Sequence, residues 1–109
     1  MGWLFWAAGL MLASAVALAQ APSAADMARL TTDVRHIEAA FVDQVAGIAG
    51  VSAARIRQLL PSEPRIAERG PWLAQAISKE IRPLSESEVR AVLAADRERK
   101  NALAASRRR

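Results

Sequence analysis

Hydrophobic side chains recur every three or four residues through much of the chain, which is the period of an amphipathic helix. The longest such run predicts a helix over residues 25–46, and Gly47 or Gly50 is expected to end it. The apolar stripe of this helix is Met27, Leu30, Val34, Ile37, Phe41, Val45 and Ile48. No run of β-branched residues alternates with polar ones, so the pattern predicts no strand.

Shorter helical segments follow, each bounded by proline, glycine or a capping side chain. Ser52 is expected to cap a helix over residues 53–60, which ends because Pro61 disfavours the helical conformation of the residue before it. One or two further turns are predicted over residues 63–69, with Ser62 as their cap and Gly70 as their end.

The next predicted helix begins at Pro71, since proline fits the first helical position, and it runs to about Arg82. Its predicted buried face consists of Trp72, Leu73, Ala76, Ile77 and Ile81.

The last helix has the clearest start signal. Ser85 and Glu88 have the spacing of a capping box, and Leu84 and Val89 flank them as a hydrophobic staple. The helix is expected to run towards Ala105.

The apolar stripe of this last helix thins after Ala95, and residues 96–100 are charged all round. Asp96 and Lys100 stand four residues apart, a spacing at which an exposed ion pair stabilises a helix by only a few tenths of a kcal/mol. We therefore expect this half of the helix to project into solvent or to meet a partner.

These segments predict an all-α fold, a small bundle of about four helices behind an N-terminal signal segment, with the last helix partly projecting. The expected organisation is a signal peptide over residues 1–19, a spacer over 20–25, a helical domain over 26–106 and a basic tail over 107–109.

The first 19 residues carry no charged side chain and end in Ala17-Leu18-Ala19, the small-x-small pattern of a signal-peptidase site. Cleavage near Ala19 would place the protein in the periplasm or outside the cell. The alternative is an inner-membrane anchor over residues 2–21. Leu4 to Leu18 spans about 22 Å as a helix, whereas a bilayer core is about 30 Å thick.

Composition limits what the remaining chain can be. It has no cysteine, so no disulfide can stabilise it, and the formal net charge of +4 arises from 15 basic and 11 acidic residues. A chain of about 90 residues buries only about 60% of its unfolded surface. Such a chain depends on helix packing or on a partner for its stability.

No constellation in the sequence carries recognisable catalytic chemistry. His36 is the only histidine, and Asp33 and Asp43 share its flank of the first helix. We expect a solvated flank with ion pairs to Arg29 or Arg35, and no metal. A nucleophile elbow and a glycine-rich phosphate loop are both missing, which favours a protein that is not an enzyme and has no cofactor.

The expected partner is an unknown protein, or another copy of the chain in weak self-association. The candidate partner surface is Trp72, Leu73, Ile77, Arg97, Arg99 and Lys100. The basic C-terminus has no aromatic residue on which bases could stack, so no nucleic acid is expected. A membrane is expected only if the N-terminal segment is retained.

The stripe of the first helix also follows a heptad pattern over about three heptads. In a parallel homodimer, Asp33 and Glu38 would face each other and repel. The pattern therefore favours packing within the chain, or an antiparallel or heteromeric partner.

One short segment resembles a known family. Leu84-Ser85-Glu86-Ser87-Glu88 opens a charged helix and resembles the Leu-Thr-x-x-Gln segments of small periplasmic stress chaperones of the Spy type. The resemblance covers five residues, Ser and Glu replace Thr and Gln, and the second copy of the motif is missing. The capping box accounts for the same residues.

The sequence thus predicts an exported, non-enzymatic helical interaction or adaptor protein of the bacterial envelope. The alternative is a small membrane-tethered subunit of an envelope complex, held by uncleaved residues 2–21.

Overall fold

The computed structural model describes residues 22–61 and 68–109. Within them the chain forms four helices and no strand, which confirms the predicted all-α fold. The predicted signal segment lies outside the described residues, as do most of the turns expected over residues 63–69. The helices are α2 (Ala24–Ala49), α3 (Ala53–Leu59), α4 (Arg69–Glu80) and α5 (Glu86–Arg108).

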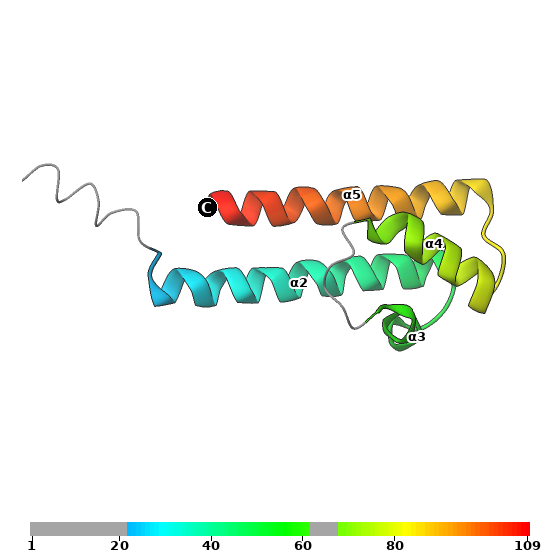
Figure 1. Ribbon diagram of the computed structural model, residues 1–109, viewed down its shortest axis with the longest axis horizontal. Coiled ribbons are helices and arrows are strands. Elements are labelled where there is room, and N and C mark those ends of the chain that lie inside the picture. Colours follow the sequence, from blue (N-terminus) through cyan, green and yellow to red (C-terminus); the bar gives the residue numbers. More distant parts are fainter. Residues whose placement is uncertain (1–21, 62–67) are drawn as a thin grey trace, which may run out of the picture.

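The two long helices, α2 and α5, lie side by side and antiparallel (Figure 1). The shorter α3 and α4 pack at the end of this hairpin where α2 ends and α5 begins. The stripe of α2 therefore packs within the chain, one of the arrangements that the heptad pattern favoured.

The core lies where all four helices meet. Each helix contributes to its largest fully buried side chains, which are Phe41, Val45, Ile56, Leu73, Ile77 and Val92. Towards the N-terminus of α2 the same stripe is less covered, since Leu30, Val34 and Ile37 are half-buried and Met27 is 53% exposed.

Local side-chain interactions begin three of the helices. Ser23 and Asp26 form a capping box at the start of α2, and Ser52 accepts a hydrogen bond from the backbone N–H of Arg55 at the start of α3. Gly50 ends α2 with a φ of 72°, a left-handed conformation that glycine adopts without steric cost. The helices expected over 25–46 and 53–60 are therefore present, with α2 three residues longer at its end.

The predicted capping box of the last helix is also present. The Ser85 hydroxyl accepts from the Glu88 N–H at 3.2 Å, and the Glu88 carboxylate accepts from the Ser85 N–H at 2.9 Å. Leu84 and Val89 are half-buried and pack against the core, as a hydrophobic staple would.

Gly70 is the second residue of α4, which begins at Arg69 and ends at Glu80, so the helix expected from Pro71 to about Arg82 lies two residues earlier. The backbone N–H of Gly70 donates to the Asp96 carboxylate at 3.1 Å, so α4 approaches α5 closely here. A Cβ at this position would lie 3.0 Å from the Cβ of Asp96, which explains why glycine fits.

The C-terminal half of α5 reaches beyond α3 and α4, but it lies along α2. This half was expected to project into solvent or to meet a partner. It instead packs one side within the chain, where Asp96 is 3% and Arg99 8% exposed, while Arg97 and Glu98 face solvent. The helix also runs past Ala105 to Arg108, where the buried Ser106 donates to Asp33 of α2 at 2.7 Å.

The capping box leads to a first prediction. Ser85→Ala should lower the free energy of unfolding by about 1 kcal/mol, because the Glu88 N–H loses its acceptor. Ser85→Asp should keep most of that stability, since aspartate also caps helices well. Urea unfolding of the purified protein, followed by circular dichroism, measures both. Equal midpoints for Ser85→Ala and the parent protein would contradict a stabilising cap.

Candidate functional site

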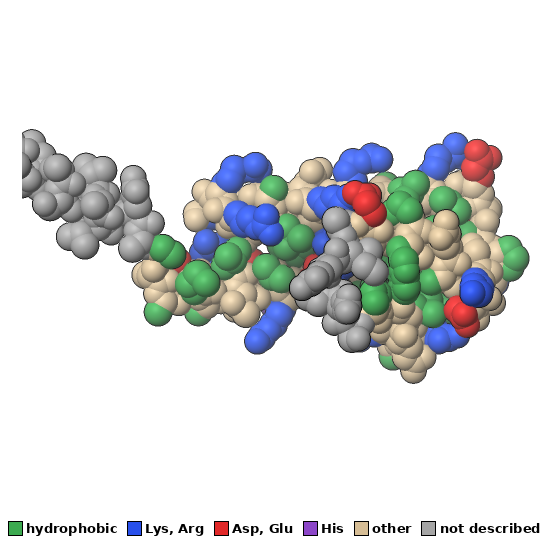
Figure 2. All heavy atoms as spheres, viewed as in Figure 1, with side chains coloured by type: hydrophobic (Ala, Val, Ile, Leu, Met, Phe, Trp, Pro, Cys, Tyr) green, Lys and Arg blue, Asp and Glu red, His purple; other side chains and the backbone are tan. Residues whose placement is uncertain are grey.

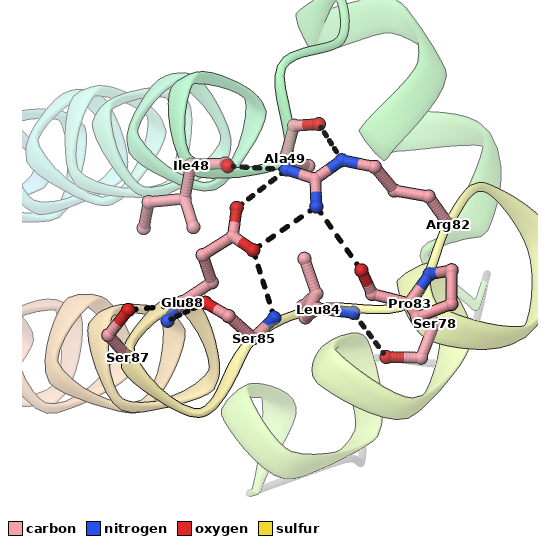
Figure 3. Close-up of polar contacts among 9 residues, drawn as sticks. All are labelled: Ile48, Ala49, Ser78, Arg82, Pro83, Leu84, Ser85, Ser87 and Glu88. Atoms are coloured by element: carbon pink, nitrogen blue, oxygen red, sulfur yellow. Dashed lines mark hydrogen bonds and ion pairs between the residues drawn. The ribbon is translucent and has the colours of Figure 1, made fainter.

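Arg82 joins the end of α2 to the start of α5 (Figure 3). Its guanidinium donates to the backbone carbonyls of Ala49 at 3.2 Å and Ile48 at 3.3 Å, which would otherwise lack helical partners. The same guanidinium donates to the Glu88 carboxylate at 2.6 and 3.1 Å. One side chain thus holds a helix C-terminus and a helix N-terminus together.

The Glu88 carboxylate is correspondingly stabilised in its ionised form. The hydrogen bonds from Arg82, followed by that from the Ser85 N–H, lower the pKa of Glu88 from 4.5 to about 2. Through the same pair, the hydrogen bond to Glu88 raises the pKa of Arg82. From the sequence, Glu88 was expected only to cap the helix. Its pairing with Arg82 depends on the path of the chain between the end of α4 and the start of α5.

A second group of charges lies between α2, α4 and α5. Arg99 donates to Asp96 at 2.8 and 2.9 Å and to Glu38 of α2 at 3.3 Å, and its guanidinium lies 5.5 Å from the centre of the Phe41 ring. Arg69 of α4 also pairs with Glu38. Burial of the Asp96–Arg99 pair removes water, so each charge must find its partners within the chain.

A third group ties the other end of the hairpin. Asp33 accepts hydrogen bonds from Ser106 and Arg109 and pairs with Arg29 at 3.0 Å. The Ser106 hydrogen bond is the largest cause that lowers the pKa of Asp33, and the two arginines add to it. The expected ion pair to Arg29 is therefore present.

Among the described residues, the fold completes no metal site on the flank of the first helix that carries His36. His36 is exposed, and no group of three or more metal-binding side chains comes together in residues 22–61 and 68–109. The three charge groups connect helices, so a binding site has to lie on the surface of the described residues.

Two surface grooves lie on either side of α4. One separates α4 from α3 and has a mixed polar and apolar lining that includes Trp72, Leu59 and Arg55. The other separates α4 from α5, has a volume of about 530 Å³ and is lined mainly by apolar atoms. Its lining residues are Pro71, Ala74, Gln75, Ser78, Lys79, Val89 and Leu93. Hydrophobic side chains appear at the surface over α4 and the first half of α5 (Figure 2).

The structure divides the candidate partner surface. Leu73 and Ile77 are fully buried in the core, and Arg99 is buried in the charge cluster, so these three do not lie on the surface. Trp72 is half-buried in the α3–α4 groove, and Arg97 is exposed.

Lys100 is half-buried and pairs with Glu68 at 2.9 Å, the largest cause that raises the pKa of Lys100. It also lies 3.6 Å from Asp96, the pair that the sequence spacing predicted.

Sequence reasoning missed Ala74, Val89 and Leu93 as the floor of a groove. Their helical spacing marked Val89 and Leu93 as inward-facing, yet both keep an exposed edge because α4 carries small side chains beside them. In the sequence, the small residues Ala74 and Ser78, four residues apart on one side of the predicted helix, could have indicated a groove there.

No single helix among the described segments is long and apolar enough to cross a membrane. By length and composition alone, α2 and α3 taken together pass that test, but the chain bends by 103° between them. Comparisons with protein-family models, curated proteins and solved structures find no match to this chain.

The Glu88 pKa predicts a pH dependence. A carboxyl whose pKa is lowered on folding stabilises the protein above its unfolded pKa, and this stability is lost as pH falls from about 4.5 to about 2. Glu88→Gln should therefore lower the melting temperature at pH 7 and flatten its fall between pH 5 and pH 2. Glu86→Gln is the matched control, because Glu86 is exposed in the same turn. A Glu88→Gln profile parallel to the parent profile would contradict this coupling.

The buried pair gives a further prediction. Asp96→Ala should lower the free energy of unfolding by about 3 kcal/mol, because it leaves the Arg99 charge buried and the Gly70 N–H without its acceptor. Glu98→Ala, at an exposed position two residues away, should cost far less. Urea denaturation measures the free energy of unfolding of both variants. A similar decrease in the two would contradict a special contribution of the buried pair.

Proposed function

We propose that this protein is an exported, non-enzymatic helical adaptor of the bacterial envelope, which binds a protein partner through the outer face of α4. The observation that carries the proposal is the position of α4 between two surface grooves. One groove contains the half-buried Trp72, and the other has a largely apolar lining.

Binding is the role that suits these surfaces. Aromatic anchors set in shallow grooves contribute strongly to the free energy of protein association. The groups around Glu88 and Asp33 connect α2 with α5, and the group around Arg99 holds α4 against this hairpin through Arg69 and Gly70. A surface that is already ordered costs less conformational entropy when it binds. Export is supported by the uncharged first 19 residues and the Ala17-Leu18-Ala19 pattern.

The two parts of the proposal are tested together in cells. A photo-crosslinking amino acid at Gln75, which lines both grooves, should form one discrete adduct with another protein. The same amino acid at Asp43, exposed on α2, is the control and should not form that adduct. Equal crosslinking from both positions, or none from either, would contradict a partner on α4.

Localisation is tested on the same cells. The protein should be released with the periplasmic or secreted fraction and should begin at Gln20 on N-terminal sequencing. A chain that begins at Met1 and resists carbonate extraction from membranes would instead support the membrane-tethered subunit.

A further inference from the structure

The groove between α4 and α5 offers an apolar surface against which one more helix can pack. Its floor is formed by Ala74 of α4 and by Val89 and Leu93 of α5. The twelve residues of α4 are about 18 Å long, which corresponds to roughly three turns of a bound helix. Two packed helices with small residues on one of them leave a trough into which a third helix can place side chains at positions i, i+3 or i+4, and i+7.

The rims of this groove carry positive charge. Lys79 lines it directly from α4. Lys79 also lines the α3–α4 groove. On α5, Arg90 and Arg97 do not line the groove, but they stand three residues before and four residues after its lining residue Leu93, on neighbouring turns of the helix. All three are exposed and form no ion pair among the described residues. Figure 2 shows basic side chains along the α5 edge of the molecule.

The neighbouring acids offset this charge only in part. Glu68 and Asp96 are paired with Lys100. Glu98 keeps its charge, but it accepts a hydrogen bond from Gln44 and so lies on the α2 side of α5, away from the groove. Glu86 is an exposed acid one turn before Arg90 and forms no ion pair within 4.0 Å among the described residues, so it offsets part of the positive charge at that end. The basic rim therefore favours a ligand with negative charge on both sides of an apolar stripe.

We propose that the α4–α5 groove binds an acidic amphipathic helix of a partner protein. Apolar side chains of that helix contact Ala74, Val89 and Leu93, and its Asp or Glu residues pair with Lys79 and with Arg90 or Arg97. This inference rests on the proposed adaptor function and specifies the chemistry of its partner. A second copy of this chain is a poor occupant, because two chains that each carry a net charge of +4 repel each other.

Two fluorescent helical peptides of equal length test the proposal with the full-length protein. Both carry leucines at helical spacing, and the residues beside the leucines are glutamate in one peptide and lysine in the other. Fluorescence anisotropy should show that the glutamate peptide binds about tenfold more tightly, the preference expected from two or three exposed ion pairs.

Charge-reversal variants locate the interaction. In Lys79→Glu/Arg90→Glu the preference for the glutamate peptide should disappear or reverse. Arg107→Glu/Arg108→Glu makes the same change in net charge at exposed residues near the C-terminus, and it should keep the preference. Both variants are expected to remain folded, because none of the four side chains forms an ion pair among the described residues. Thermal unfolding followed by circular dichroism checks this.

The proposal would be overturned if neither peptide bound, or if both bound with equal affinity. An equal loss of the preference for the glutamate peptide in the two double variants would also overturn it. So would concentration-dependent dimers of the protein that Lys79→Glu/Arg90→Glu abolishes. Vesicles of anionic phospholipid that compete with the glutamate peptide through Lys79 and Arg90 would reassign the groove to a membrane surface. If the peptides fail while the Gln75 crosslink persists, the acidic helix is wrong and the adaptor function stands.

Discussion

The buried ion pair between Asp96 and Arg99 sets the arrangement of the three longer helices. Charges removed from water must be compensated inside the protein, and the compensation here comes from separate elements. Glu38 on α2 faces Arg99, and the N–H of Gly70 on α4 faces Asp96. A shift of α2 by one turn would break the contact between Arg99 and Glu38, and a shift of α4 would remove the Gly70 N–H from Asp96, whereas the pair within α5 would persist. These contacts favour one register of α2 and α4 against α5, in addition to the apolar core.

The hairpin is held in the same way at both of its ends. At one end Arg82 binds the last carbonyls of α2 and the Glu88 carboxylate of α5, and at the other Asp33 receives Ser106 and Arg109. Between these contacts the apolar core is concentrated near α3 and α4 and becomes thin along the rest of α2. Polar contacts at defined positions thus extend the order of the hairpin beyond the region that hydrophobic burial covers.

The charges of the protein fall into two sets, those that connect helices in the interior and those that remain exposed at the surface. Groups that connect helices are paired and partly shielded, whereas the exposed basic residues beside the α4–α5 groove face solvent. Because α4 is held by Arg69 through Glu38 and by Gly70 through Asp96, its outer face is presented in one orientation. A surface of that kind is ordered before any ligand arrives, which is the property that an adaptor requires.

The sequence alone determined the features that arise within a few residues of each other. The helical periodicity indicated the four helices, and the serine caps at 52 and 85 marked the starts of α3 and α5. The ends of α2, α4 and α5 lie two or three residues from the expected positions. The tertiary structure decided which side of each helix faces the interior. A run such as residues 96–100 carries charge in every direction, so only the approach of α2 and α4 could select Asp96 and Arg99 for burial. For the same reason Leu73 and Ile77 became core while Trp72, their neighbour in the same apolar stretch, kept an exposed edge. From the sequence, Gly70 was expected to end a helix, because glycine is common at helix ends. Its actual role depends on the close approach of α5, a long-range contact that the local sequence does not indicate.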